Sequence, residues 1–448
     1  MKLVKSLLLG SAAGLVAVAS AQAADLPTRK AAPAEYVRIC DAYGSGFFYI
    51  PGTETCMQLS GLVRAEYLWR STKNYGTVAL VPNTVGGFSA AVSSGRSSHD
   101  IGMFARGRLN VDTRTQTSWG TLRSYFRFEI QHSSAAYVGG NGSWTDKDNA
   151  RLYYGFIQFA GITAGRAQSF FDFYANAWNY GTYRMSDNSV NLLAYTATFG
   201  GGFSATLSIE DPSARSWGVG RSYGGLGIAA TGAKYPDVIG ALRVDQGWGS
   251  AQLSGAWGHR TTMASSLPGA WHKDYNAWAI KGGVKINLPM LAAGDELYLE
   301  ATYARGAADY LGGLPGIAYS GYQAPYYSTI AYPVVGGYSV SMNKGWSAMA
   351  AFQHYWSPSF RTVLMGSYLQ VDYDSVAKNV YGLRKGNEWR VGGMAIWSPV
   401  KGMDIGLELI YAKVQNSVTP AMAAAIRAAG LKKDPDSFEA RLRIQRAF

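Results

Sequence analysis

The chain has 448 residues, of which 48% are hydrophobic, 13% aromatic and 16% charged, with 54 glycines and a formal net charge of +12. The charged fraction lies well below the roughly 25% of an average soluble domain, whereas glycine exceeds the usual ~7%. These values exclude an intrinsically disordered chain and a coiled coil, since both need more charge and fewer aromatic residues.

Residues 1–23 have the pattern of a secretory signal peptide. Lys2 and Lys5 form a positively charged start, an apolar run follows, and residues 21–23 form a small-residue cleavage site. We therefore expect an exported protein. No later stretch approaches the ~18 consecutive apolar residues of a membrane-spanning helix. The mature chain is then either soluble in an oxidising compartment or a closed β-barrel in a membrane.

Residues 24–56 are expected to form a periplasmic N-terminal segment. This segment contains Cys40 and Cys56, the only two cysteines of the sequence. Two nearby thiols in an oxidising compartment are expected to pair, which would close a glycine-containing loop. A redox-active role is the alternative, but the spacing is not the C-x-x-C of redox motifs.

From Met57 onwards, apolar and polar residues alternate with a period of two. In the first such segment Leu59, Val63 and Tyr67 alternate with polar residues that include Arg64 and Glu66. This period predicts β-strands with one apolar and one polar face. A single strand of this kind fits a soluble sandwich as well as a membrane barrel, so the number and spacing of the segments must decide.

About sixteen segments of this kind are candidate strands, and several have the ~10 residues of a tilted transmembrane strand. They lie at 57–70, 101–113, 119–131, 150–159, 161–166, 190–199, 203–210, 236–246, 249–259, 276–288, 295–305, 345–356, 359–372, 388–398, 402–414 and 437–448.

Short and long connections alternate strictly between these segments. The short ones include residues 160–161, 247–248 and 357–358, and the long ones lie around 71–100, 132–149, 167–189, 211–235, 260–275, 306–344, 373–387 and 415–436. Short turns on one rim, long loops on the other and an even strand number are typical of outer-membrane barrels. Residues 57–448 are therefore predicted to form an all-β, 16-stranded antiparallel transmembrane β-barrel with short periplasmic turns and long extracellular loops.

Large aromatic residues fall at the ends of the candidate strands, where interfacial girdles would lie. They include Trp69, Trp119, Trp248, Trp257, Trp356, Trp389, Trp397 and Phe448. The alternative is that aromatic residues are simply common in β-proteins.

Sixteen strands leave a lumen wide enough for water, and charged rings set the selectivity of such pores. The first three strands place five arginines on the predicted inward face, each near the middle of its segment: Arg64, Arg106, Arg108, Arg123 and Arg127. We expect one basic patch at similar depth on one wall. The alternative is a set of solvated charges with no shared role.

The third long loop, between Arg166 and Val190, is rich in aromatic residues and carries Asp172 and Asp187. Such a loop is expected to pack against other parts of the chain. Folded into the lumen, it would narrow the pore between its acids and the arginine wall. Outside the barrel, its aromatic residues would instead contact neighbouring molecules.

Several stretches of the sequence resemble the trimeric general-diffusion porins of the alphaproteobacterial outer membrane. They are residues 35–40, 47–56, 63–67, 165–173, 194–197 and 397–400, together with the terminal Phe448. The resemblance implies a 16-stranded homotrimer with the third loop as an inward constriction, and a terminal Phe448 that is read by the barrel-assembly machinery. The loops at 71–100 and 306–344 are where we expect departures from relatives.

The function predicted from these observations is passive diffusion of small hydrophilic solutes and ions across the bacterial outer membrane. A substrate-specific channel for a sugar or an anion is the alternative, and stacked aromatics or further basic residues along the lumen would be its signature. An outer-membrane hydrolase is a distant third, because H-E-x-x-H is absent from the sequence.

No metal and no cofactor are expected, because the five histidines have no metal-ligand spacing. The basic residues are interleaved with apolar positions on strands and do not cluster on one exposed face. This distribution favours lumen lining and contacts with lipopolysaccharide over binding of nucleic acid.

Overall fold

The computed structural model describes residues 38–71, 75–82, 88–95, 99–137, 146–174, 178–218, 228–264, 271–312, 329–334, 337–374, 378–379 and 382–448. The predicted signal peptide at 1–23 lies outside these residues. The chain divides into two compact units, one up to Cys56 and one from Met57 onwards.

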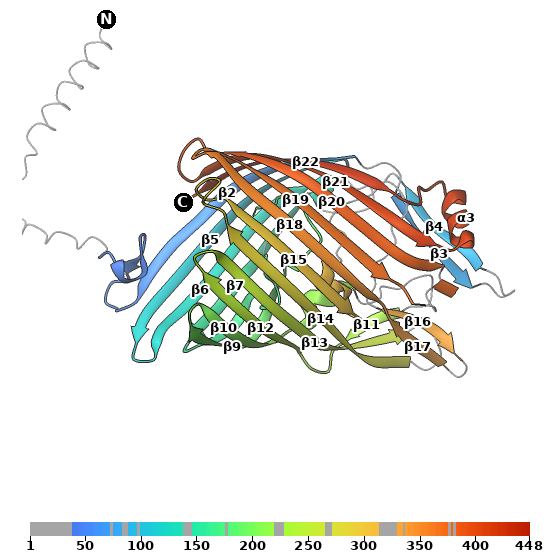
Figure 1. Ribbon diagram of the computed structural model, residues 1–448, viewed down its shortest axis with the longest axis horizontal. Helices are drawn as coiled ribbons and strands as arrows, with labels where there is room; N and C mark the ends of the chain where they lie inside the picture. Colours follow the sequence, from blue (N-terminus) through green and yellow to red (C-terminus); the bar gives the residue numbers. More distant parts are fainter. Residues whose placement is uncertain are drawn as a thin grey trace, which may run out of the picture. The chain divides into compact units, whose positions relative to one another are not determined.

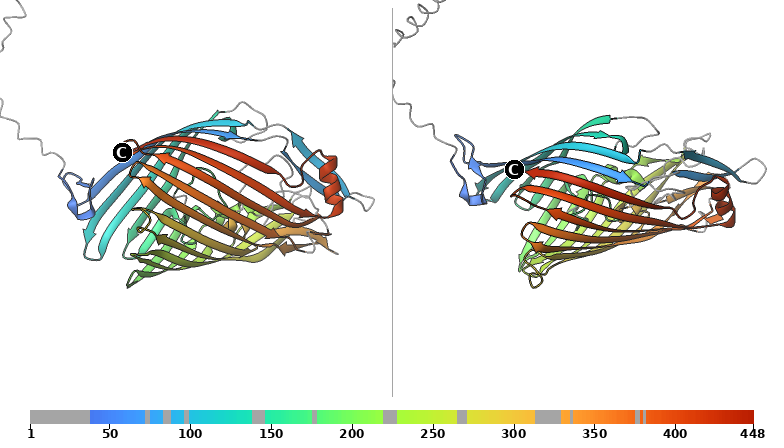
Figure 2. Two further views of the ribbon diagram at one scale, coloured as in Figure 1. Left: turned by 45° about the horizontal axis from the view of Figure 1, so that its top comes forward. Right: turned by 90° about the horizontal axis from the view of Figure 1, so that it is seen from above.

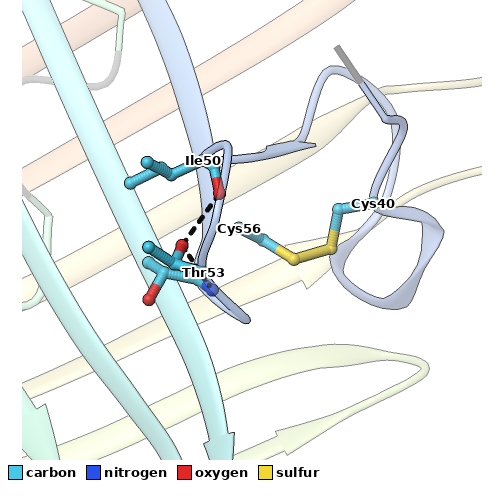
Figure 3. Close-up of a disulfide and its surroundings, with 5 residues drawn as sticks. Cys40, Ile50, Thr53 and Cys56 are labelled. Atoms are coloured by element: carbon cyan, nitrogen blue, oxygen red, sulfur yellow. Dashed lines mark hydrogen bonds between the residues drawn. A yellow bond between two sulfur atoms is a disulfide. The ribbon is translucent and has the colours of Figure 1, made fainter. Parts of the chain in front are cut away.

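The first unit is a small loop closed by the disulfide between Cys40 and Cys56, whose Cα atoms lie 6.0 Å apart (Figure 3). It contains the short helix η1 (Asp41–Tyr43) and strand β1 (Phe48–Tyr49). Thr53 donates hydrogen bonds from its amide and its hydroxyl to the Ile50 carbonyl, over 3.0 and 2.9 Å. The predicted cysteine pairing is confirmed, and both cysteines are buried.

In the described part of the second unit, sixteen antiparallel strands form a closed barrel (Figures 1 and 2). They are β2 (Cys56–Arg70), β5 (Ile101–Thr117), β6 (Gly120–Ser134), β7 (Asp146–Phe159), β8 (Ile162–Gln168), β9 (Ser189–Gly200), β10 (Phe203–Glu210), β12 (Asp237–Gln246), β13 (Gly249–Ala264), β14 (Trp271–Asn287), β15 (Glu296–Arg305), β18 (Lys344–Ser357), β19 (Phe360–Asp372), β20 (Leu383–Trp397), β21 (Met403–Val418) and β22 (Asp436–Ala447). All sixteen predicted strands are confirmed. Where an observed strand is clearly longer than the predicted one, the extra residues mostly lie at the end that joins a long loop. Backbone pairing between neighbouring strands continues there beyond the residues that show the apolar–polar alternation.

The barrel closes where the last strand, β22, pairs with the first, β2, from Leu62 opposite Ala447 to Arg70 opposite Glu439. The amide of Gly61 donates to the Phe448 carbonyl over 2.9 Å, and the Phe448 amide donates to the Gly61 carbonyl over 3.0 Å. Gly61 has no room for a side chain, because an added Cβ would overlap the Arg108 carbonyl oxygen and approach the Phe448 ring. The terminal residue is thus part of the seam.

Short turns join the strands at one rim, as predicted. Two of them depend on glycines with positive φ, Gly202 (φ 82°) and Gly249 (φ 142°). A Cβ at either position would overlap a backbone carbonyl oxygen of the adjacent strand, that of Asp245 or Lys285 respectively. Glycine at these turns therefore allows close approach of neighbouring backbones as well as a left-handed conformation.

The long connections contain elements that the sequence analysis treated as loops. These elements are the hairpins β3 (Tyr75–Pro82) with β4 (Phe88–Gly95) and β16 (Thr329–Val334) with β17 (Gly337–Met342), strand β11 (Ile228–Gly232), helix α3 (Pro420–Ala428), and the short helices η2 (Ala135–Tyr137), η3 (Pro212–Gly218) and η4 (Ala308–Leu311). Figure 1 shows α3 and both hairpins at the end of the barrel opposite the short turns. In α3, the Thr419 side chain accepts a hydrogen bond from the Met422 amide, and Pro420 is the first residue of the helix. Both features are typical of a helix N-terminus, so the start of α3 is encoded locally.

The predicted faces of the strands are confirmed by exposure. Apolar residues assigned to the outer face are exposed, for example Val63 at 61% and Leu207 at 62%, whereas Glu66 on the inner face is 1% exposed. Most of the predicted girdle residues are also exposed, including Trp69, Trp119, Trp248, Trp257, Trp356, Trp397 and Phe448. No helix in the described part of the chain is both long enough and apolar enough to span a membrane.

Candidate pore constriction

The third loop lies between β8 and β9, and its described residues, 169–174 and 178–188, contact inward-facing side chains of the barrel wall. At its start the wall residues donate to the loop backbone: Gln252 on β13 to the Phe170 carbonyl over 3.1 Å and Ser254 to the Phe171 carbonyl over 2.8 Å. Further along, the Tyr174 amide donates to Glu300 on β15 over 3.2 Å. These contacts lie on the side of the wall on which the sequence analysis expects the loop.

The second half of the loop is held by strands further around the barrel. Glu408 on β21 accepts hydrogen bonds from the amides of Tyr180 and Gly181 over 3.2 and 2.5 Å. The Arg184 amide donates to Ser367 on β19 over 3.0 Å. The described part of the loop therefore contacts the inner faces of β13, β15, β19 and β21.

Inward-facing glycines make room for the aromatic side chains of this loop. A Cβ added at Gly283, Gly392 or Gly406 would overlap the side chain of Phe173, Tyr183 or Tyr180, respectively. These glycines lie on β14, β20 and β21, where a larger residue would push the loop off the wall. The position of the loop is thus encoded in the strands as well as in the loop.

Asp172 is a buried anchor at the base of the loop. Its side chain, 7% exposed, accepts hydrogen bonds from Gln168 Nε2 over 2.7 Å, the Asn188 amide over 2.7 Å and Ser186 Oγ over 2.5 Å. It also pairs with Arg215 Nη2 of η3 over 3.4 Å. Through these partners, Asp172 links the two ends of the third loop to each other and to η3, which follows β10.

Asp187 is half-buried and lies nearer to the arginine-bearing wall. Its carboxylate accepts from Gln168 Nε2 over 3.0 Å, and Gln168 Oε1 accepts from the Tyr154 hydroxyl on β7 over 2.8 Å. Burial, followed by the nearby charge of Asp172, raises the pKa of Asp187 to about 7. This carboxyl group therefore changes charge near neutral pH.

The five predicted arginines all lie on the inner faces of β2, β5 and β6, but they are not at one depth. Across β5 and β6, Arg106 pairs in register with Gln131, Arg108 with Glu129 and Arg127 with Asn110. Arg123 lies opposite Arg114, eight residues along β5 from Arg106, which is about 27 Å of strand. The expectation of similar depth is wrong, because the tight turn between β5 and β6 fixes a register that spreads the arginines along the pore.

Each of these arginines is held by a neighbouring side chain on the wall. The Nε hydrogen bonds run from Arg64 to Gln445 (2.9 Å), from Arg106 to Gln131 (2.8 Å), from Arg108 to Glu129 (2.7 Å), from Arg123 to Asp112 (2.9 Å) and from Arg127 to Asn110 (2.8 Å). Arg64 also lies within electrostatic range of Arg106 and Arg108. Arg64, Arg106 and Arg108 therefore form a basic cluster on the wall.

The structure adds lumen residues that the sequence analysis did not assign. Arg151 on β7 donates from Nε to Glu129 over 3.0 Å, and Arg443 on β22 donates from Nε to Glu66 over 2.6 Å. Tyr153 and Tyr154 lie beside these groups at a β-bulge, where the register shifts between Arg127 and Phe128. A bulge breaks the period of two, so alternation could not assign the faces of this strand.

A closed 16-stranded barrel with an apolar outer face, a charged lumen and an inward third loop is the architecture of an outer-membrane porin. The family model described as the porin subfamily matches residues 25–439, and the chain belongs to this family. It is a porin of the bacterial outer membrane.

Porins of Brucella are among the relatives to which the chain is similar. Porin Omp2b of Brucella suis is 32% identical over 339 residues, which cover 65% of this chain and 82% of the relative. Porin Omp2b of Brucella abortus strain 2308 is 30% identical over 326 residues, with the same two shares. The resemblance to alphaproteobacterial porins is confirmed by these relatives.

Among solved structures, the outer membrane channel DcaP of Acinetobacter baumannii matches with a TM-score of 0.59. The match covers 89% of this chain and 99% of that one at 15% identity. At this identity the likeness supports the barrel fold alone.

Proposed function

We propose that the chain is a general-diffusion pore whose narrowest part lies between the third loop and the arginine-bearing wall of β2, β5, β6 and β7. Small hydrophilic solutes and ions pass down their gradients through this opening, and the protein performs no catalytic step. The observation that carries the proposal is the path of the loop. Because hydrogen bonds fix it to β13, β15, β19 and β21, the basic wall faces it across the lumen.

The charges on the two sides of this opening support a preference for anions. Glu129 is shared by Arg106, Arg108 and Arg151, so one carboxylate faces three guanidinium groups. On the loop side Asp172 is paired with Arg215, and the pKa of Asp187 is raised to about 7. Rings of unbalanced charge at a constriction set ion selectivity. In this proposal Asp172 fixes the loop and Asp187 supplies its charge.

The partners follow from the same class of protein. We propose a homotrimer, supported by the broad exposed apolar faces of the strands and by the family resemblance. Lipopolysaccharide would contact the outer surface of the barrel, and the barrel-assembly machinery would recognise the strand that ends in Phe448. No role in nucleic-acid binding is proposed.

A substrate-specific channel for an anion or a sugar is the second candidate. It is favoured by a specific observation, the stacked aromatic rings of Tyr125 and Phe156 on the inner wall, 5.3 Å apart. Sugar selectivity would show as a solute that blocks conductance at low concentration.

The test is single-channel conductance of the purified protein in a planar bilayer under a salt gradient. We expect ohmic steps that arrive in groups of three, together with a reversal potential that indicates weak anion preference. Absent steps would contradict the pore itself. Steps with strong cation preference would contradict the assignment of the arginine wall to the constriction.

A further inference from the structure

Arginine and aromatic side chains alternate along the inner face of β6 and β7. The register places Tyr125 opposite Phe156, Arg127 opposite Tyr154 and Glu129 opposite Arg151. Successive rows are two residues apart, about 7 Å along a strand. We name this group the arginine–aromatic ladder; its members are Arg106, Arg108, Arg123, Arg127, Arg151, Tyr125, Tyr153, Tyr154 and Phe156.

The bulge in β7 places Tyr153 at the centre of the ladder. Three guanidinium groups lie over its ring: Arg151 at 4.7 Å from the ring centroid, Arg127 at 5.7 Å and Arg108 at 5.9 Å. The ring of Tyr154 packs edge-on at 4.7 Å. Because these arginines come from β5, β6 and β7, a single bulged residue joins three strands of the wall.

Other rungs repeat the same contact. Arg127 lies 5.1 Å from the Tyr154 ring centroid, and Arg123 lies 5.2 Å from that of Tyr125 and 5.6 Å from that of Phe156. Cations within about 6 Å of a ring centroid are attracted to the face of the ring. The aromatic residues therefore hold the guanidinium groups in place along about 20 Å of strand.

A ring holds a guanidinium group without cancelling its charge, which a carboxylate partner would do. The hydrogen bonds of Arg127 go to Asn110 Oδ1 over 2.8 Å and to the Tyr125 hydroxyl over 3.0 Å, and both acceptors are neutral. Within the described part of the chain, Arg127 makes no ion pair. Arg184 of the third loop, in contrast, is buried and paired with Glu388. Arg123 is paired with Asp112, and Arg106, Arg108 and Arg151 share Glu129, so the five arginines of the ladder outnumber these two carboxylates.

We propose that the arginine–aromatic ladder is a series of weak binding sites for small organic carboxylates, with Tyr153 as a positioning residue. This inference rests on the proposed function of the pore. The planar fork of arginine matches a carboxylate by two parallel hydrogen bonds, which a chloride ion cannot accept in the same way. Several sites of modest strength in sequence let an anion enter readily and still leave. The aromatic residues affect anion passage although they carry no charge.

The test compares three variants of the full-length protein in planar bilayers. Tyr153→Leu removes the ring, and Tyr153→Phe keeps it. Tyr355→Leu is the matched control, because Arg361 lies 5.8 Å from that ring but is also held by Asp404 over 3.0 Å. For each protein, conductance is measured against the concentration of potassium acetate and of potassium chloride.

For the wild type we expect conductance that saturates at lower concentration in acetate than in chloride. Tyr153→Leu should raise the half-saturating acetate concentration about twofold to fivefold, the change that one or two exposed cation–π contacts support. Tyr153→Phe and Tyr355→Leu should keep the wild-type value. Wild-type saturation in Tyr153→Leu, or an equal rise in Tyr153→Phe, would overturn the proposal.

Three further variants keep the outcome decisive. If Tyr153→Leu does not assemble, Tyr154→Leu and Tyr154→Phe replace it, since the Phe variant keeps the ring and loses only the hydroxyl, which bonds to Gln168 and Ser189. Arg127→Gln separates the two proposals. A shift in reversal potential with Arg127→Gln but no acetate effect of the ring variants overturns the ladder and leaves the charged wall intact. No shift with Arg127→Gln, in a pore that still conducts, overturns the wall and the ladder together.

Discussion

Arg184 in the third loop donates a hydrogen bond from Nε to Oε1 of Glu388 on β20 over 2.9 Å, and both side chains are buried. Arg390 pairs with the same carboxylate. One buried acid thus balances two buried arginines, and the two partners are not equivalent. Removing Glu388 takes this carboxylate from both arginines, whereas removing Arg184 leaves the pair of Glu388 with Arg390.

This asymmetry predicts the effect of single substitutions on the loop. Glu388→Gln should destabilise the folded barrel by about 3–5 kcal/mol, the usual cost of leaving buried charge without its partner. Arg184→Met should cost clearly less, because Glu388 keeps Arg390. Thermal unfolding followed by circular dichroism shows which of the two variants is less stable. Open-channel noise reports the mobility of the loop. Equal destabilisation by the two variants would contradict this account.

The basic wall predicts a change in ion selectivity. In Arg106→Gln/Arg108→Gln the cluster loses two positive charges, and Glu129 keeps its ion pair with Arg151. The reversal potential in a salt gradient should therefore shift toward cation preference. Arg446→Gln, a change of equal charge at an exposed residue near the short turns, is the matched control. If the double variant Arg106→Gln/Arg108→Gln kept the wild-type selectivity, these two residues would lie away from the constriction.

Asp187 predicts a pH dependence near neutrality. Its pKa in the folded chain, about 7, lies above the usual value near 4, so the folded state favours the neutral acid. The stability that this proton contributes is present at low pH and is lost as the pH rises through about 7. Above that pH the loop also gains a negative charge beside Tyr154. Wild-type selectivity should move toward cations between pH 5.5 and pH 8.5.

Asp187→Asn provides the control for this pH effect. The variant keeps a polar group beside Gln168 but cannot ionise, so its reversal potential should stay near the low-pH value of the wild type. Asp172, Lys281 and Glu300 also act on Asp187 and are unchanged in the variant. A pH response of full size in Asp187→Asn would assign the titration to another group.

The inward glycines predict a steric effect on conductance. Gly406→Val would overlap the ring of Tyr180 and displace the loop toward the open lumen, which should lower single-channel conductance. Overpacking of this kind typically costs about 1–3 kcal/mol in stability. Gly240→Val is the matched control, because no heavy atom lies within 4 Å of a Cβ at that position. Equal conductance of the two variants would show that the loop yields without narrowing the pore.

Much of the barrel could be predicted from the sequence, because a lipid-facing and a water-facing side require strict alternation. Leu59 and Val63, for instance, reveal the outer face of β2 without any tertiary information. The depth of the arginines could not be predicted in this way, because it depends on the register of β5 and β6. That register places Arg123 opposite Arg114 and not beside Arg106.

The path of the third loop was predictable only as a tendency to fold inward. Its contacts with Glu408 and Glu388 join residues more than 200 positions apart, and local patterns carry no such information. The ladder was missed for a different reason. Tyr153 is the bulged residue of β7, and a bulge shifts the alternation on which the assignment of inner and outer faces depends.

The seam between β2 and β22 has a consequence for the order of assembly. The hydrogen bond from Arg64 to Gln445 spans 381 positions of the chain, so the wall stays open along two edges until the final strand arrives. Open edges offer unpaired amides and carbonyls to any other chain that approaches. Contacts of such long range also form slowly. Sealing of the cylinder is therefore the last step of its formation, and both edges need protection until then.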